Sequence, residues 1–138
     1  MIEAILLAAL LHRPLPLVEA VYAAGGVDCV AIVNCENPEW DVKAIRREPR
    51  GYTSYGLGQI DNEWHNQHRG DVKAHIAEMA RIYGECEGKD MATRVSHYNG
   101  GTYPPRYSVL WGIKVQRERD RMVRWLEWRR LKALGVAW

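Results

Sequence analysis

The chain has 138 residues, of which 47% are hydrophobic and 26% are charged. This length suits one domain with a substantial core, and the composition is that of an ordinary soluble globular protein, so we expect a single domain over residues 1–138. The formal net charge of +2 is small, no nucleic-acid-binding module is recognisable, and no apolar run approaches the roughly 18 residues that cross a bilayer.

The first eleven residues form an apolar run with an acidic side chain, Glu3, near its start. Two interpretations fit this run. A signal peptide normally begins with a basic segment, which this run lacks, whereas a helix of the core can end before Pro14. We therefore favour a first core helix over a signal peptide.

Two short helices are predicted next. Residues Leu17–Ala24 are mostly apolar and end at Gly25-Gly26, a pair that is typical of a helix C-terminus. Asp28 is placed to cap the second helix, which runs to Glu36 and ends because the residue before Pro38 disfavours the helical conformation.

The rest of the chain changes from irregular to helical. Residues 37–62 are rich in proline and glycine, and any strand is predicted within Tyr52–Ile60. Three helices are then predicted, from Val72 to about Tyr83 with Asp71 as its cap, from Asp90 to Tyr98, and from Tyr107 to about Leu134. The sequence therefore predicts a mainly α fold of the α+β type, a compact helical domain with a short irregular or β segment around residues 37–62 and a long basic C-terminal helix.

Charge is unevenly distributed along the chain. Residues 106–138 carry nine Lys and Arg against three Asp and Glu, a net charge of +6, whereas residues 1–105 carry ten against fourteen, a net charge of −4. Residues 113–138 are thus a basic helical extension, and its stretch Lys114–Arg121 is almost entirely polar and expected to face water. Two interpretations stay open: the extension binds an anionic envelope surface, or it is a solvated helix face.

Cysteine and histidine give no sign of a disulfide framework or a metal site. Cys29 and Cys35 are roughly 9 Å apart along one predicted helix, too far to bridge, so buried free thiols are expected. His65 and His68 are three residues apart, but no further ligands stand at a matching spacing for zinc. We expect neither a metal nor a cofactor.

Glu36 is the first candidate for chemistry, since it ends an apolar helix where the chain becomes irregular. Burial raises the pKa of a carboxyl group, because the charged form loses hydration, and such a group can act as a general acid near neutral pH. Glu39 is a close rival. Taken alone, either glutamate is more often an exposed residue at a helix end.

Two later segments could complete a site. Gly56-Leu57-Gly58 offers main chain that a ligand can approach closely, and Gln59 can both donate to and accept from sugar hydroxyls and acetamides. Tyr98-Asn99 places a phenol and an amide before a glycine pair, and Tyr107 follows. Taken alone, these segments are a tight turn and a helix C-terminus.

In this order the segments resemble the catalytic domain of soluble lytic transglycosylases, within the lysozyme-like superfamily. That family has a glutamate-serine pair at the end of an apolar helix, then an aromatic-Asn-Pro-x-Ala-Val stretch, a Gly-Leu-Met-Gln-Ile segment and, later, Ala-Tyr-Asn-Ala-Gly. The similar segments here are Ala31–Glu36, Trp40–Ile45, Gly56–Ile60 and Ser96–Gly101. The resemblance covers about residues 17–112.

The resemblance implies a lysozyme-like fold and a lytic transglycosylase that cleaves the β-1,4 bond between N-acetylmuramic acid and N-acetylglucosamine in peptidoglycan. Glu36 would protonate the glycosidic oxygen and then act as base on the muramic 6-hydroxyl, which closes a 1,6-anhydro ring. Tyr98 would orient Glu36. The substrate groove would be lined by Gly56, Leu57, Gln59, Asn99 and Tyr107.

Some positions depart from the family pattern. Asn37 replaces the serine after the acid, one extra residue separates Glu36 from Trp40, Gly58 stands where methionine is usual, and residues 46–54 are longer than the family loop. A catalytically lapsed module that binds glycan or envelope therefore stays open as an alternative.

A hydrolytic, lysozyme-like muramidase also stays open. Ordinary glycosidases use two carboxyl groups, about 5 Å or about 6.5–9.5 Å apart. Side chains that could supply the second group are Asp41, Glu48, Asp61 and Glu63. In either case the resemblance implies action at the cell wall or in the periplasm, and without a convincing signal peptide we expect delivery by a phage or export by another route.

Overall fold

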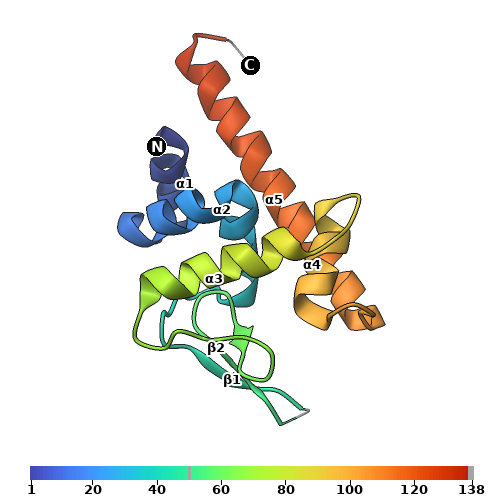
Figure 1. Ribbon diagram of the computed structural model, residues 1–138. Helices are drawn as coiled ribbons and strands as arrows, with labels where there is room; N and C mark the ends of the chain where they lie inside the picture. Colours follow the sequence, from blue (N-terminus) through green and yellow to red (C-terminus); the bar gives the residue numbers. More distant parts are fainter. Residues whose placement is uncertain (50, 137–138) are drawn as a thin grey trace.

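The computed structural model describes residues 1–49 and 51–136. Over this range the chain forms the helices α1 (Ile2–Leu11), α2 (Leu15–Glu36), α3 (Val72–Glu85), α4 (Met91–Gly100) and α5 (Arg106–Ala133), and the strands β1 (Ile45–Arg47), β2 (Thr53–Tyr55) and β3 (Ile60–Asp61). The expected mainly α fold, with a short β segment inside residues 37–62 and a long C-terminal helix, is confirmed (Figure 1). The last two residues of the predicted basic extension, 137–138, lie outside the described range.

The two helices expected between residues 17 and 36 form one element with a break. Gly25 has φ −151° and Gly26 has φ 66° and ψ −161°, so neither residue is helical, and the chain changes direction between the two halves of α2. Asp28 does not act as the helix cap that the sequence predicts. Its carboxylate accepts a hydrogen bond from Tyr83 Oη at 2.9 Å and pairs with Arg119 at 3.3 Å, which ties α2 to α3 and α5.

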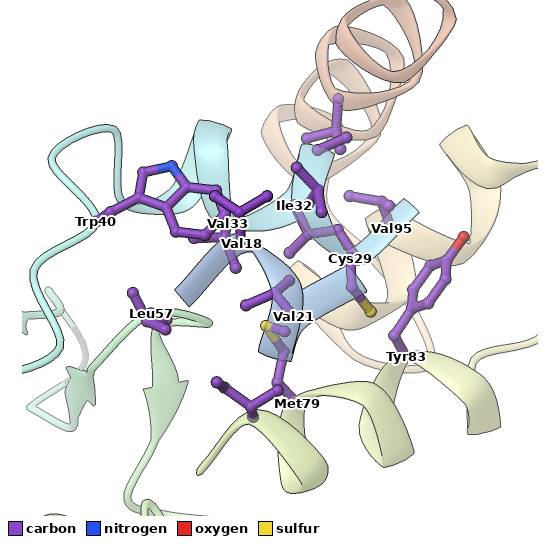
Figure 2. Packing of buried hydrophobic residues seen from close by; sticks show 14 of the residues in the cluster. Val18, Val21, Cys29, Ile32, Val33, Trp40, Leu57, Met79, Tyr83 and Val95 are labelled. Atoms are coloured by element: carbon purple, nitrogen blue, oxygen red, sulfur yellow. The ribbon is translucent and has the colours of Figure 1, made fainter. Parts of the chain in front are cut away.

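The second half of α2 is the centre of the core (Figure 2). Five consecutive residues, Cys29 to Val33, are fully buried, so helices or loops cover this segment on every side. The side chains that pack around it come from several other elements: Leu7, Leu57, Met79, Val95, Val115 and Met122. By length and composition α2 could span a bilayer, contrary to the expectation that no apolar run is long enough, but a core helix passes the same test and the second half of α2 is buried in the core.

Two later helices begin at aspartate caps, of which Asp71 was predicted from the sequence and Asp90 was expected only as the start of its helix. Asp71 accepts a hydrogen bond from the main-chain N–H of Ala74 at 2.9 Å, and Asp90 accepts one from Thr93 at 2.9 Å. Because the first N–H groups of a helix lack main-chain partners, these carboxylates fix where α3 and α4 begin.

The strands form an antiparallel meander in the order β1-β2-β3, with Ile45 opposite Tyr55 and Tyr55 opposite Ile60. Residues 56–59 are the turn between β2 and β3. The Gly-Leu-Gly-Gln segment, which looked strand-like in the sequence, is therefore a loop that begins with Gly56 at φ 73° and ends with Gln59 at φ 48°. This loop faces the C-terminal end of α2.

Helix α5 packs on α4 and α2 through its first two thirds, and its C-terminal end extends beyond the body of the domain (Figure 1). The stretch 114–121, expected to face water throughout, is only partly exposed, because Val115 is fully buried and Arg119 pairs with Asp28. Helix α1 contributes Ala4, Leu7 and Ala8 to buried positions, as the interpretation as a core helix requires. Cys29, Cys35 and Cys86 are free thiols.

Candidate active site

Glu36 is the last residue of α2, and its side chain is only 3% exposed. Three donors from different elements reach its carboxylate. Trp111 Nε1 on α5 donates to Oε1 at 2.8 Å, Asn99 Nδ2 on α4 lies 3.4 Å from the same oxygen, and Arg46 Nη2 on β1 lies 3.0 Å from Oε2. The carboxyl group is thus held in one orientation at the point where α2, α4, α5 and the sheet meet.

The pKa of Glu36 is raised above the ordinary value for a glutamate. Burial is the largest cause, because it removes hydration from the charged form, and Arg46, Trp111 and Asn99 offset only part of this effect. Glu39, the rival from the sequence, is exposed and lies outside this arrangement. A carboxyl group that keeps its proton to higher pH is suited to act as a general acid.

A polar pocket opens over Glu36. The residues that line it come from α2, the sheet, α4 and the start of α5: Glu36, Arg46, Glu48, Tyr52, Ser54, Gln59, Asp61, Tyr98, Asn99 and Tyr107. Of the predicted site residues, the structure brings together Glu36, Tyr98, Gln59, Asn99 and Tyr107. Three carboxyl groups share the pocket, since Glu48 and Asp61 line it as well, whereas Asp41 and Glu63 do not.

Gly56 and Leu57 do not have the predicted position in the groove. The Leu57 side chain is fully buried in the core, because the turn bends it inward between α2 and α3. The Gly56 carbonyl faces inward and accepts from Asn37 Nδ2 at 3.1 Å and Gln59 Nε2 at 2.9 Å. A Cβ at Gly56 would also collide with the ring of His75, so this glycine serves packing and not the approach of a ligand.

Gln59 does point into the pocket, but its amide is already engaged. Its φ of 48° is in the left-handed region, which costs a non-glycine residue about 1–2 kcal/mol. Its Nε2 donates to the Gly56 carbonyl, and its Oε1 accepts from Arg46 Nε at 3.3 Å. Strain of this size at the edge of a pocket is typical of functional sites.

Tyr98 lies in the pocket, but its hydroxyl does not donate to Glu36, as the predicted orienting role would require. Its hydroxyl donates to the Gly58 carbonyl at 2.7 Å, so it fixes the turn 56–59 and not the carboxyl group. Burial and, next, the charge of Glu36 raise the pKa of Tyr98 well above 10, so the phenol stays protonated. A Cβ at Gly58 would overlap this hydroxyl and the Met79 side chain, which explains why glycine stands where the family resemblance leads one to expect methionine.

Asn99 and Tyr107 occupy the side of the pocket formed by α4 and α5. Ser108 Oγ donates to Asn99 Oδ1 at 2.7 Å, which turns the Asn99 amide nitrogen toward Glu36. Tyr107 is 61% exposed at the rim, where its ring is free to meet the apolar face of a sugar.

Trp111 and Arg46 hydrogen-bond to Glu36, and the sequence did not reveal either of them. Trp111 is one helical turn after Tyr107, so the spacing places both on neighbouring positions of α5, but nothing local indicates that its indole donates to Glu36. Arg46 is one of several cations in residues 43–50. Its role depends on the pairing of β1 with β2, which brings it between Glu36 and Glu48.

Asn37, which replaces the family serine, has a structural role. Its amide donates to the Asp41 carbonyl at 2.7 Å and to the Gly56 carbonyl at 3.1 Å, and its Oδ1 accepts from Asp41 N–H at 3.1 Å. The side chain therefore joins the loop after α2 to the turn 56–59. Trp40, after the extra residue, is buried, and its indole donates to Asn34 at 3.2 Å.

His75 supports the turn from behind. Its Nε2 accepts from the Gly58 N–H at 3.0 Å, so Nδ1 carries the proton and donates to the Gln67 carbonyl at 2.9 Å. This arrangement requires the neutral imidazole. Burial lowers the pKa of His75, because a charged ring would lose hydration there and the Gly58 N–H would lose its acceptor.

We predict that His75 makes stability fall in acid. His75 takes up a proton near pH 6.5 in the unfolded chain and only at lower pH in the folded chain. Its contribution to the free energy of unfolding is therefore fully present above about pH 6.5 and is lost as the pH falls through the lowered pKa. His75→Gln should lose about 1–3 kcal/mol at pH 7.5. It should also have a flatter pH dependence, which urea unfolding between pH 5 and pH 8 measures.

His65→Gln is the control, because it removes a histidine that supports no such turn. It should keep the pH dependence of the wild type. If the free energies of unfolding of His75→Gln and of the wild type fall in parallel between pH 6.5 and pH 5, the neutral imidazole of His75 is not the cause of the pH dependence.

Within residues 1–49 and 51–136, no group of three or more His, Cys, Asp or Glu is arranged to hold a metal ion. Comparison with known proteins adds no relative, since no family model, no curated protein and no solved structure matches the chain. The functional interpretation therefore depends on the motifs and on the geometry around Glu36.

Proposed function

We propose that this protein is a lytic transglycosylase that cleaves the glycan strands of peptidoglycan, with Glu36 as its one catalytic carboxyl group. The observation that carries the proposal is the environment of Glu36. The carboxyl is buried, has a raised pKa, is oriented by three donors and lies at a polar pocket. An isolated glutamate at a helix end would be solvated and would have none of these properties.

In the proposed reaction Glu36 transfers its proton to the oxygen of the scissile glycosidic bond, and the bond from this oxygen to C1 of the muramic residue breaks. The acetamide of the substrate stabilises the positive charge that develops at C1. Glu36, now ionised, accepts the proton of the muramic 6-hydroxyl. The oxygen of that hydroxyl bonds to C1 of the same muramic residue. Glu36 is protonated again, no water is consumed, and the product has a 1,6-anhydro end.

The donors to Glu36 and its burial serve opposite halves of this cycle. Trp111 Nε1 and Asn99 Nδ2 contact Oε1, so they stabilise the carboxylate that forms after proton transfer. Burial has the opposite effect and favours the protonated form that begins the cycle. A group that must act first as acid and then as base needs both forms to be accessible, and these opposed effects leave the pKa of Glu36 raised but less than burial alone would raise it.

A hydrolytic muramidase is the second candidate. Glu48 and Asp61 line the same pocket as Glu36, so either could activate a water molecule as a second carboxyl group. Each has partners: Glu48 accepts from Ser54 Oγ at 3.0 Å, and Asp61 accepts from the N–H groups of Glu63 and Trp64. We favour the transglycosylase because Glu36 is the buried and oriented member of the three.

A lapsed, glycan-binding module is the third candidate, and the pair of Arg46 with Glu36 favours it. An arginine 3.0 Å from the carboxylate stabilises the ionised form, which cannot donate a proton. Arg46 is half exposed, with 49% of its side chain open to solvent. A bound glycan could therefore displace it from Glu36.

Digestion of purified peptidoglycan followed by mass spectrometry of the products separates these candidates. Transglycosylation leaves 1,6-anhydro muramic ends, whereas hydrolysis leaves reducing ends that are heavier by one water. Sedimentation of the protein with insoluble peptidoglycan, without release of fragments, would instead indicate the binding module.

Replacing Arg46 should shift the pH dependence of cleavage. Arg46 lowers the pKa of Glu36, so Arg46→Met is expected to raise this pKa further, and the basic limb of the activity profile moves to higher pH because the acid stays protonated there. The measurements are the pH profile of peptidoglycan solubilisation and an NMR titration of the Glu36 side-chain carboxyl carbon.

Arg47→Met is the matched control, since Arg47 is the next residue on β1 and its side chain points to the other face of the strand. It should leave both the profile and the titration unchanged. An Arg46→Met protein whose Glu36 titrates at the wild-type pH would contradict the effect assigned to the ion pair.

A further inference from the structure

One end of the molecule, away from the sheet and the pocket, combines exposed apolar side chains with cations that have few partners. Helix α1 and the part of α5 from Arg117 onward contribute to it, and the two helices contact one another (Figure 1). We call this surface the distal face, and its residues are Met1, Ile2, Ile5, Arg117, Arg121, Arg124, Trp128, Arg129 and Lys132.

The outward side of α5 is basic because of its helical spacing. Arg117, Arg121, Arg124 and Trp128 follow one another at intervals of three or four residues, so they lie along one side of the helix. Val115 and Met122 lie on the opposite side and are fully buried. The cations are therefore directed away from the domain.

These cations have little internal compensation. Arg121 pairs with Glu118 on the same helix at 2.7 Å, but Arg117 and Arg124 form no ion pair with any residue in the described part of the chain. Trp128 is 37% exposed, and its ring lies 6.0 Å from the Arg129 guanidinium and 5.6 Å from the Lys132 ammonium. A tryptophan among cations at a solvent boundary is typical of interfacial helices.

Helix α1 adds the apolar part of the distal face. It buries Ala4, Leu7 and Ala8 against the domain, but Ile2 is 66% exposed and Ile5 is 47% exposed on its other side. Two large aliphatic side chains are therefore open to water on α1, a helix that contacts α5.

We propose that the distal face docks on the surface of an anionic lipid bilayer. Arginine and lysine pair with the lipid phosphates, and Ile2, Ile5 and Trp128 enter the boundary between headgroups and acyl chains. A purely polyanionic polymer would be recognised by the cations alone and would leave the exposed isoleucines without a role.

Docking at this face leaves the pocket open. Tyr107 at the pocket rim is ten residues of continuous helix, roughly 15 Å, from Arg117, the nearest α5 residue of the distal face, and 25 residues, roughly 37 Å, from Lys132. The proposal does not depend on the chemistry at Glu36.

Co-sedimentation with vesicles tests the proposal. The wild-type chain should bind vesicles of phosphatidylglycerol and phosphatidylcholine, but not vesicles of phosphatidylcholine alone. Each cation near an anionic surface strengthens partitioning about five-fold, so the triple variant Arg117→Gln, Arg124→Gln, Lys132→Gln should bind on the order of 100-fold more weakly. The triple variant Ile2→Gln, Ile5→Gln, Trp128→Gln should also bind more weakly, and its residual binding should disappear at high salt.

The matched control removes three exposed cations elsewhere, through Arg47→Gln, Lys73→Gln and Lys89→Gln, and should bind anionic vesicles as the wild type does. Circular dichroism verifies that each variant is folded. The proposal is overturned if the control weakens binding as much as the α5 variant does. It is also overturned if the apolar variant binds vesicles with wild-type affinity while soluble polyphosphate displaces both proteins equally, since the face would then recognise polyanions and not a bilayer.

Discussion

Replacing Glu36 with glutamine is expected to slow peptidoglycan cleavage by roughly 10²–10⁴-fold while the protein stays folded. Glutamine has nearly the same shape, and its Oε1 can still accept from Trp111 Nε1, whereas half-exposed Arg46 turns to solvent because the amide nitrogen in place of Oε2 cannot accept from it. The amide has no acidic proton to give to the glycosidic oxygen. Release of soluble fragments from purified peptidoglycan, measured over time, gives the rate.

The same substitution should not destabilise the protein near neutral pH. The raised pKa of Glu36 means that its ionised form is less favourable in the folded chain than in the unfolded chain, so this ionisation reduces stability above the unfolded pKa of about 4.5. Removing the charge removes that loss, and the thermal midpoint at pH 7 should stay the same or rise.

Glu39→Gln is the matched control, because it changes an exposed glutamate three residues away. It should cleave at the wild-type rate. Full activity of Glu36→Gln, or an equal loss in Glu39→Gln, would mean that the general acid has been misassigned. Loss of cleavage with retained binding to peptidoglycan is the pattern expected if Glu36 acts in the chemical step.

The fold was predictable to the extent that local chemistry determines it. Asp71 and Asp90 are capping residues whose carboxylates can serve the next turn without help from distant residues, and both helices begin where expected. Asp28 has the same chemistry but a different role, because Tyr83 and Arg119 from α3 and α5 reach its carboxylate. A capping signal can thus be overridden by partners far away in the sequence.

The sequence predicts which segments form the site, but it does not predict which side chains hydrogen-bond to one another there. Glu36 ends an apolar helix, and only its order with the later Gly-Leu-Gly-Gln and Tyr-Asn-Gly-Gly segments favoured a buried acid over an exposed helix end; in the structure it is buried and its pKa is raised. Trp111 is 75 residues away from Glu36, so no local pattern could connect its indole with the carboxyl group. Tyr98 was placed in the right pocket but given the wrong partner, because the turn at Gly58 brings a carbonyl group closer to the phenol than the acid is.

The contacts around Glu36 depend on how closely α4 and α5 approach one another. Asn99 comes from α4 and Trp111 from α5, and both donate to the same carboxylate oxygen. Gly112, next to Trp111, is buried at the crossing of the two helices, where a Cβ would overlap the main-chain carbonyl of Ala92 on α4. The absence of a side chain at this glycine therefore sets the spacing of the two donors.

Gly112→Ala is accordingly expected to reduce both stability and activity. A main-chain carbonyl cannot rotate away as a side chain can, so α4 and α5 must separate, and we expect a loss of about 3 kcal/mol in the free energy of unfolding. A displacement of about 1 Å in the donors can lower a catalytic rate about 100-fold, so cleavage by the folded fraction should fall as well. Urea unfolding and peptidoglycan solubilisation at a temperature well below the midpoint measure the two effects separately.

Gly84→Ala provides the matched control, since Gly84 also lies within a helix but has no atom within 4 Å of the added Cβ. Alanine is the better helix former, so this variant should gain up to about 1 kcal/mol and keep full activity. If Gly112→Ala loses stability but cleaves at the wild-type rate, the spacing of α4 and α5 supports the fold without setting the geometry at Glu36. Parallel losses in stability and rate, absent from Gly84→Ala, would instead mean that one close helix contact determines both the packing of the domain and the orientation of its acid.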